Sequence, residues 1–408
     1  MSKKSPQLRF KGFTDDWEER KLGEVGYFYY GKSAPKWSVT EDAETPCVRY
    51  GELYTKYGAK ISNIYSHTNI NPKNLKFSTG NEVLVPRVGE NPLDFSLCSW
   101  LSIPNVAIGE MISVYNTNEN PLFISYYFRS QMKYEFAKRV EGGNVSNLYY
   151  SYLEDIDLYI PKLEEQIAIS KFFEKLDDTI ALHQRKLDLL KEQKKGYLQK
   201  MFPKNGAKVP ELRFAGFADD WEERKLEELA LVLTGFPFKN EDFVDNGKYL
   251  VITNGNIQNE SSTVDVSLGN RVDDLSDEIK ERYYLNKNDI LVTMDGTVGR
   301  TAKVVDDNMI LAQRVARLVA NKNTEFVYQW LNQGSFFNEM TKVSHGGTIK
   351  HISLNEISNY SATVPSNNIE QQKIGSFFKK IDDTIALHQR KLDLLKEQKK
   401  GFLQKMFV

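Results

Sequence analysis

Asp177–Gly196 reads DDTIALHQRKLDLLKEQKKG, and Asp382–Gly401 reads the same letters without a change. The match continues through LQKMF after one replacement, Tyr197 in the first copy and Phe402 in the second. Both copies lack proline and are rich in Leu, Lys, Gln and Glu, which are strong helix formers. An identity of this length marks an internal repeat, so we predict that the chain contains the same long helix twice.

Apolar residues recur in each copy at steps of three and four, which is the spacing of a coiled-coil seam. The seam comprises Phe173, Leu176, Ile180, Leu187 and Leu190 in the first copy, and Phe378, Ile381, Ile385, Leu392 and Leu395 in the second. It is interrupted by His183 and Lys194, and by His388 and Lys399. A lone helix would leave this stripe in water, so we expect the two copies to pack against each other. From about Glu165 to Met201 such a helix spans roughly 55 Å and acts as a spacer.

A second repeated block opens each half of the chain. Pro6–Leu22 reads PQLRFKGFTDDWEERKL, and Pro210–Leu226 reads PELRFAGFADDWEERKL. The offset is 204 residues here (210 − 6) and 205 at the helices (382 − 177), so one unit is written twice. A duplicated unit favours pseudo-two-fold symmetry, in which the two helices run antiparallel. We therefore divide the chain into a first domain (1–164), a first spacer helix (165–203), a second domain (204–369) and a second spacer helix (370–408).

The two middles differ in sequence but share a skeleton of short β-branched runs, which are typical of strands. Strands are predicted at 82–85, 112–115, 249–253, 290–293, 303–305 and 315–319, and amphipathic helices at 123–140 and 325–343. The predicted fold class is α+β. Two mixed α/β domains are separated by a pair of long antiparallel coiled-coil helices, with a pseudo-two-fold internal repeat.

Composition bounds the class of protein. A hydrophobic fraction of 40% and an aromatic fraction of 12% suffice for packed cores. The net charge of −1 does not decide on nucleic-acid binding, because a neutral total can include a basic face. Cys47 and Cys98 have no metal spacing and are expected to be buried thiols. The N-terminus has no apolar targeting segment and no run approaches ~18 apolar residues, so we expect a cytoplasmic protein without membrane spans.

The stretch from Gly26 to Ser33 matches the phosphate-binding pattern G-x-x-x-x-G-K-[ST] to the letter. A phosphate cradle needs an apolar strand before it and a helix after it, whereas Pro35 follows here. Four bulky aromatics separate the two glycines, and the second unit lacks Lys and Ser at the same place. We retain a nucleotide-binding enzyme only as a minor alternative.

Two glycine-rich stretches of the second domain could face a polyanion. Gly296–Arg300 is either a plain hairpin or a loop that directs Thr297, Arg300 and nearby Lys303 toward phosphates, and both interpretations stay open. His345–His351 contains two glycines with Thr348, Lys350 and His351, whose donors suit phosphates or base edges. Two histidines six residues apart without a cysteine or carboxylate cluster make a poor metal site, so no metal is predicted. Scattered cations in both domains, Arg314 among them, are each individually typical of a solvated surface.

The arrangement resembles the specificity subunit of type I restriction-modification enzymes. The likeness rests on the twin LRFxGFxxDWEERKL openings, on 288–300 and 346–352, and on the Glu-Gln pairs that lead into the repeated helices. We also find no nucleophile elbow, zinc signature, nuclease triad or methyl-donor loop, so no catalytic residue is predicted. The first domain departs from the pattern, with Pro86-Arg-Val-Gly where the second has Met294-Asp-Gly-Thr.

The resemblance implies that each domain reads one half of an asymmetric split site in double-stranded DNA, while the helices set the spacing and dock two modification subunits. These partners would bring S-adenosylmethionine for adenine-N6 methylation, and restriction subunits would bring ATP and magnesium; this chain would have no cofactor. Half-sites one helical turn apart lie roughly 34–36 Å centre to centre, within reach of such a helix pair. The candidate DNA-binding residues are Arg49, Tyr50, Lys56, Lys60, Arg87, Asn144, Asn147, Asn254, Asn256, Thr297, Arg300, Lys303, His345, Thr348, Lys350 and His351.

Besides the nucleotide-binding enzyme, one alternative of another class remains. A noncatalytic protein-interaction scaffold would show no steep salt-dependent binding to a duplex, unlike a DNA reader. Within the resemblance, an orphan subunit or an anti-restriction decoy has the same sequence features as a working specificity subunit.

Overall fold

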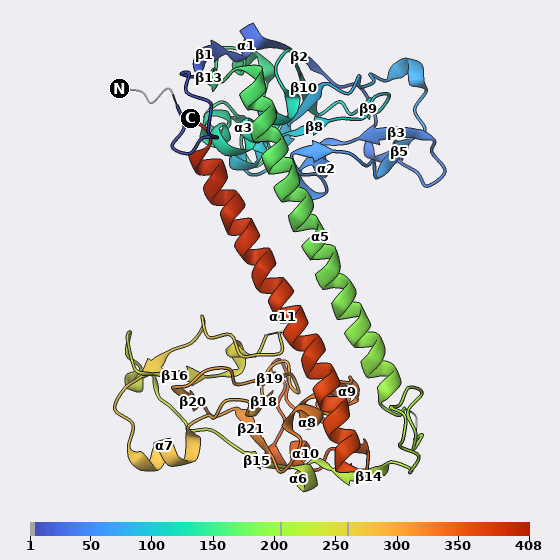
Figure 1. The fold of residues 1–408 in the computed structure, drawn as a ribbon, viewed down its shortest axis with the longest axis vertical. Coiled ribbons are helices and arrows are strands. Elements are labelled where there is room, and N and C mark those ends of the chain that lie inside the picture. The colour runs from blue at the N-terminus through green and yellow to red at the C-terminus, as the bar shows by residue number, and fades with distance from the viewer. Residues whose placement is uncertain (1–4, 205, 259–260) are drawn as a thin grey trace. The chain divides into compact units, whose positions relative to one another are not determined.

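The computed structural model describes residues 5–204, 206–258 and 261–408. It divides into two compact units, Met1–His183 with Lys391–Val408, and Gln184–Arg390. Each unit contains one globular domain and the adjoining parts of both long helices, α5 (Leu163–Met201) and α11 (Asn368–Lys405) (Figure 1). These units divide each helix, whereas the four segments proposed from the sequence keep each helix whole. The segment boundaries therefore stay predictions.

The first unit is built on a five-stranded sheet with the order β2-β10-β6-β8-β4. Its strands are β2 (Gly26–Tyr30), β4 (Lys60–Ile61), β6 (Glu82–Pro86), β8 (Ser99–Leu101) and β10 (Ile112–Thr117). Neighbours are antiparallel except β4 and β8. The central strand β6 is buried along its whole length, as expected of a short apolar run in a sheet interior.

Three smaller sheets and four α-helices, with four short 3-10 helices, complete the described part of this domain. The sheets pair β1 (Glu18–Lys21) with β13 (Asp157–Ile160), β3 (Thr45–Val48) with β5 (Ser66–Thr68) and β9 (Ala107–Ile108), and β12 (Ser146–Asn147) with β7 (Val88–Gly89) and β11 (Glu141–Gly142). The helices are α1 (Leu22–Val25), α2 (Tyr50–Thr55), α3 (Pro121–Gln131) and α4 (Lys133–Ala137). α3 packs on β6 and β8, and it is buried from Leu122 to Phe128.

The second unit repeats this plan on a four-stranded antiparallel sheet with the order β15-β21-β18-β19. Its strands are β15 (Ala230–Leu233), β18 (Ile290–Thr293), β19 (Thr301–Lys303) and β21 (Val315–Ala320). The smaller sheets pair β14 (Glu222–Lys225) with β22 (Ser361–Val364), and β16 (Tyr249–Ile252) with β17 (Arg271–Val272) and β20 (Met309–Leu311). The helices are α6 (Leu226–Leu229), α7 (Asp277–Tyr283), α8 (Thr324–Leu331), α9 (Ser335–Val343) and α10 (Leu354–Ser358).

Three predicted elements need correction. The expected helices at 123–140 and 325–343 are each two helices, α3 with α4 and α8 with α9. In the second domain the break falls at Gly334, whose φ of +104° is a left-handed conformation that ends a helix. The strand expected at 303–305 is β19, which ends at Lys303 because its ladder with β18 stops at Ile290.

The repeated opening block anchors the start of each long helix. The Arg9 guanidinium donates two hydrogen bonds of 2.7 Å to Glu165, and Arg213 donates bonds of 2.7 and 2.9 Å to Glu370. Both carboxylates are buried, and these hydrogen bonds raise the pKa of each guanidinium. A bidentate pair satisfies both partners, so this buried charge is tolerated.

Within each unit the two long helices pack antiparallel. In the first unit, Phe172 contacts Phe402 and Asp177 pairs with Lys399, so residue numbers that rise along α5 meet residue numbers that fall along α11. In the second unit, Tyr197 contacts Phe377 in the same manner. The backbone repeats too: Leu8 N–H donates to Lys405 O and Leu212 N–H to Lys200 O, both at 2.9 Å. Each domain core thus includes aromatic residues of both helices.

Cys47 and Cys98 are both buried and free. None of the helices formed by the described residues is long and apolar enough to cross a membrane.

Candidate nucleic-acid interface

Three loops of the second domain meet and form what we name the second-domain loop cluster: residues 294–300, 313–314 and 345–351. The backbone of His345 and His351 exchanges hydrogen bonds of 3.0 and 2.8 Å, which closes a tight hairpin. That hairpin docks on the β18–β19 loop through Gly296 N–H, which donates to Lys350 O at 2.8 Å. Gly346 has a φ of +105°, and a Cβ there would lie 2.4 Å from Ile349 O, so the hairpin requires glycine.

Charged side chains converge at the centre of this cluster. The Asp295 carboxylate contacts His351 Nδ1, and Arg314 Nε lies 3.6 Å from its other oxygen. Arg314 Nη1 lies 3.5 Å from the same imidazole nitrogen, and the rings of His345 and His351 meet edge to face at 5.3 Å. Arg314 has a φ of +78°, which is uncommon for a residue with a side chain and costs about 1–3 kcal/mol. The fold therefore holds this arginine in a strained position beside a carboxylate.

Glu356 borders the cluster and explains part of its electrostatics. Burial raises the pKa of this carboxyl, but hydrogen bonds from the Ser353 backbone and hydroxyl, with the charges of His345 and His351, outweigh burial and lower it. The Glu356 carboxylate is therefore charged at neutral pH and caps α10. Among the described residues, no group of three or more His, Cys, Asp or Glu side chains has a geometry that could hold a metal ion.

The Gly296–Arg300 stretch is the connection of the β18–β19 hairpin. Thr293 Oγ1 donates to Thr297 O at 2.6 Å and accepts from Arg300 N–H at 3.0 Å, so the loop is fixed from within. Thr297 itself is exposed. The hairpin interpretation of the sequence is thus correct, and it is compatible with an exposed Thr297 facing a ligand.

The first domain builds the same junction from different residues. Arg87 N–H donates to Met111 O at 3.2 Å, as Met294 N–H donates to Arg314 O at 3.1 Å. The Arg87 guanidinium lies over the rings of Tyr30 and Tyr149, at 4.7 and 5.9 Å from their centres. Nearby, β11 and β12 form a hairpin whose turn, residues 143–145, is exposed and includes Asn144; Asn147 is half-buried in β12.

Several predicted DNA-binding residues have partners inside the fold. Lys60 pairs with Glu174 of α5 at 2.6 Å, and the buried Lys303 pairs with Glu325 at 2.6 Å. Asn256 is buried and donates to the carbonyls of Asp265 and Leu268. We omit Lys60, Lys303 and Asn256 from the proposed DNA contacts, since their polar groups already stabilise the domains.

The remaining candidates fall into two groups. Around α2, Arg49 and Tyr50 are half-buried at its start, and Lys56 is exposed, pairs with Glu52 at 3.0 Å and lies over the Tyr65 ring. In the second domain, the half-buried Asn254 accepts from Met294 N–H at 3.3 Å, which joins it to the loop cluster. Exposed members of that cluster are His345, Thr348 and Lys350, while Arg300 and His351 are half-buried.

Sequence reasoning missed Asp295, Tyr30 and Tyr149 and did not select Arg314; the Asp-Gly-Thr-Val-Gly-Arg run was a signal for Asp295.

The predicted seam residues line the helix pair. Phe173, Leu187, Phe378 and Leu392 are buried, and the other six are half-buried: Leu176, Ile180, Leu190, Ile381, Ile385 and Leu395. The two lysines that interrupt the seam form ion pairs with aspartates of the other helix, Lys194 with Asp382 at 2.7 Å and Lys399 with Asp177 at 2.5 Å. These aspartates also accept hydrogen bonds from α8 and α3, through Gln329 and Tyr126 respectively.

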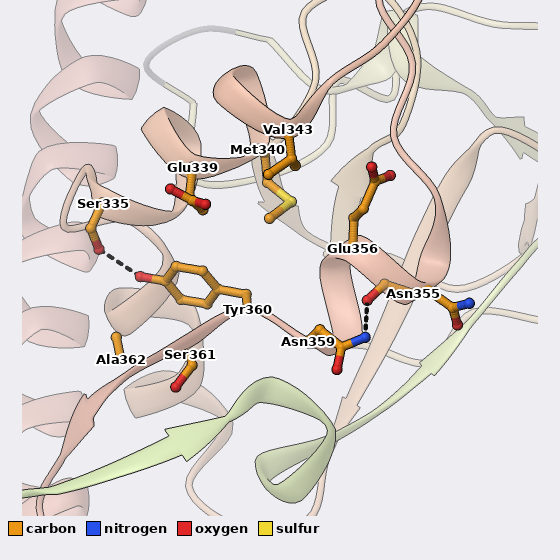
Figure 2. Close-up of a pocket in the computed structure, with 10 residues that line it drawn as sticks. All are labelled: Ser335, Glu339, Met340, Val343, Asn355, Glu356, Asn359, Tyr360, Ser361 and Ala362. Carbon is orange, nitrogen blue, oxygen red and sulfur yellow. Dashed lines mark hydrogen bonds between the residues drawn. The ribbon is translucent and has the colours of Figure 1, made fainter.

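Two hollows of the second unit differ in character. A groove of about 530 Å³ between α9, α10 and β22 contains Glu339 and Glu356, and its described lining includes no Lys or Arg (Figure 2). Figure 2 shows the Ser335 hydroxyl bonded to Tyr360 across it, at 2.5 Å. A second groove of about 690 Å³ lies between α5 and the β18–β19 hairpin and is lined by Lys191, Lys194, Lys195 and Arg300, with Glu192 and Asp382. Only the second groove has the cations that a phosphate backbone attracts.

Comparison with known proteins agrees with this geometry. The family model described as "Type I restriction modification DNA specificity domain" matches residues 14–192 and again 218–397. The chain belongs to this specificity-domain family. The two matched segments correspond to the two halves of the internal repeat, so the predicted resemblance is confirmed.

Of two curated relatives, one spans almost the full length of this chain and the other spans less than half of it. The type I restriction enzyme MjaVIII specificity subunit of Methanocaldococcus jannaschii is 23% identical and covers 95% of this chain and 91% of its own length. The putative MjaX specificity subunit of the same organism is 28% identical over 44% of this chain and 41% of its own. A solved S subunit of a type I system from M. genitalium superposes with a TM-score of 0.69 at 16% identity, with 99% of both chains covered. The fold class predicted from the sequence is thereby confirmed.

Proposed function

We propose that this chain is the DNA-reading specificity subunit of a type I restriction-modification complex, and that each domain recognises one half of an asymmetric, split site in double-stranded DNA. The observation that supports this is that one frame is repeated within the chain while its two loop sets differ. The Arg–Glu anchors and helix contacts repeat in both units, whereas the junction holds Arg87 with tyrosines in one and Asp295, Arg314 and His351 in the other. Two different loop surfaces on two equivalent frames are what recognition of two different DNA half-sites requires.

The long helices would set the gap between the half-sites and dock the modification subunits. α5 is one continuous helix of 39 residues, roughly 58 Å long at ~1.5 Å per residue. Outside the seam it exposes Leu182 and Leu189, one heptad apart, and α11 exposes Leu387 and Leu394 at the equivalent places. Two equal apolar stripes would each receive one copy of the same partner.

The chemistry would belong to other polypeptides in the cytoplasm. Modification subunits would bring S-adenosylmethionine and transfer its methyl group to adenine N6, and restriction subunits would bring ATP and magnesium. This chain would supply sequence recognition and geometry alone, without a catalytic residue or a cofactor of its own. Two relatives are named as specificity subunits of type I restriction enzymes, one of them putatively, and these names support this division of labour.

The test is methylome sequencing of a host that expresses the chain with its modification subunit. We expect one methylated motif with two unlike halves and an unread gap, absent when either subunit is omitted. Purified complex should bind a duplex containing that motif with a steep fall in affinity as salt rises, because phosphate contacts release counterions. A chain that yields no motif and binds duplexes without salt dependence is a protein scaffold instead. Methylation by the chain alone would contradict its noncatalytic role.

A further inference from the structure

Each domain places one arginine at the same strand junction, but from opposite strands. Arg87 lies directly after β6 in the first domain, and Arg314 lies directly before β21 in the second. Because Arg87 N–H bonds to Met111 O as Met294 N–H bonds to Arg314 O, Arg87 corresponds to Met294 and Met111 to Arg314. In the first domain arginine donates this backbone hydrogen bond and methionine accepts it, whereas in the second domain methionine donates it and arginine accepts it.

Arg314 is presented to solvent in a prepared position. Its side chain is 54% exposed, and its Nε end faces Asp295, whose own side chain is 25% exposed. The neighbouring loops contain Gly296 and Gly347. A Cβ built on either glycine would meet no atom within 4 Å, so a bulky ligand can approach the backbone there. A planar guanidinium held by a carboxylate loses less conformational freedom when it binds.

Arg87 is prepared in a different manner. Its guanidinium lies over the rings of Tyr30 and Tyr149. The side chain is half-buried, and its Nε is buried without a hydrogen-bond partner. Stacking on an aromatic face restrains the guanidinium plane while its terminal N–H groups stay available.

Resting on the proposed function, we propose that Arg314 and Arg87 are specificity-determining residues, each of which reads one guanine in the major groove of its own half-site. The guanidinium fork matches guanine O6 and N7, which is the commonest specific contact between a side chain and a base. Asp295 is a positioning residue that orients Arg314 and does not itself contact the base.

The experiment measures base preference with the whole complex. Arg314→Ala, Arg314→Lys and Arg87→Ala are each assembled with the modification subunit, and binding to a library randomised over both half-sites is sequenced. Arg314→Ala should lower affinity for the cognate site by about 5- to 150-fold and abolish the preference for guanine at one position of one half-site. Arg87→Ala should do the same in the other half-site. Arg314→Lys keeps the charge but not the planar fork, so it should weaken the guanine preference less than Arg314→Ala does.

Two further variants separate reading from folding and from charge. Asp295→Asn should weaken the preference at the position that Arg314 reads and leave every other position unchanged, which a general loss of stability would not do. Arg282→Ala removes another exposed arginine of the same domain, on α7, and should leave all base preferences unchanged. The unaffected half-site in each variant serves as an internal control for an intact complex.

The outcomes distinguish this inference from the function on which it rests. If the unaltered complex selects no split motif, the proposed function fails. If it selects one but Arg314→Ala weakens binding equally for all sequences, Arg314 contacts phosphate and the inference is wrong. Retention of the guanine preference by both alanine variants would equally overturn it.

Discussion

Asp177 and Asp382 occupy equivalent positions in the two copies of the repeated block. The structure nevertheless predicts that their ion pairs contribute different free energies to stability. Asp382 is 7% exposed and its partner Lys194 17%, whereas Asp177 is 32% exposed and its partner Lys399 25%. Asp382 also accepts a 2.7 Å hydrogen bond from the fully buried Gln329. Removal of one partner of a buried ion pair leaves an uncompensated charge, while water compensates for a more exposed one.

We therefore expect Asp382→Asn to destabilise the second unit by about 3–5 kcal/mol, as breaking a buried pair does. Asp177→Asn should cost the first unit about 1–2 kcal/mol, between the ranges for buried and surface pairs. Asp383→Asn is the matched control: this neighbour pairs with Lys379 on the surface, at 65% exposure, and should cost less than about 0.5 kcal/mol.

Hydrogen exchange of peptides around Lys194 and Lys399 measures these losses separately, because it reports the opening free energy of each region. Asp382→Asn should speed exchange around Lys194 by about 140- to 3700-fold, since 1.4 kcal/mol is a factor of ten. Adding Lys194→Met removes the stranded charge and should recover most of the loss. Equal effects of Asp177→Asn and Asp382→Asn, or no recovery, would refute the assignment of cost to burial.

Three further outcomes are expected. Seven residues added to each of α5 and α11 lengthen each helix by about 10.5 Å, so methylome sequencing should find the same half-sites about three base pairs further apart, and an unchanged gap would disprove the spacer. Gly235→Ala should cost at least ~2 kcal/mol in urea unfolding, because its Cβ would lie 2.2 Å from Ala312 O, whereas Gly347→Ala meets no atom and should be neutral. Arg213→Ala strands the buried Glu370 and should cost about 3–5 kcal/mol by the same assay, and a loss below 1 kcal/mol would show that water reaches the carboxylate.

The internal repeat made most of the fold predictable. A long seam and its exact duplicate can bury their apolar faces on each other, and the strand at 290–293 was predicted with its bounds. The helix breaks near Gly334 and after Gln131 were not foreseen, since a helical periodicity continues across a short interruption and does not reveal it.

The site was less predictable, because a sequence reveals the type of a side chain but not its partner. Lys303 and Arg314 are both cations in the second domain, yet one is buried against Glu325 and the other is exposed beside Asp295. Asn256 is a polar residue in a turn, a type of residue that DNA-binding proteins often use, but its side-chain amide donates to two backbone carbonyls.

The amino-acid sequence alone determined that the chain is one unit repeated, with two equal helices and two unlike domains. Both the helical periodicity and the internal identity can be observed directly in the sequence. Only the tertiary structure decided which of two adjacent aspartates receives a seam lysine, and which arginine stands at each domain's loop junction. Those outcomes depend on burial and on contacts between residues far apart in the chain. Asp177 and Asp382, which are equivalent in sequence, therefore contribute differently to stability because the two domains bury their ion pairs to different extents.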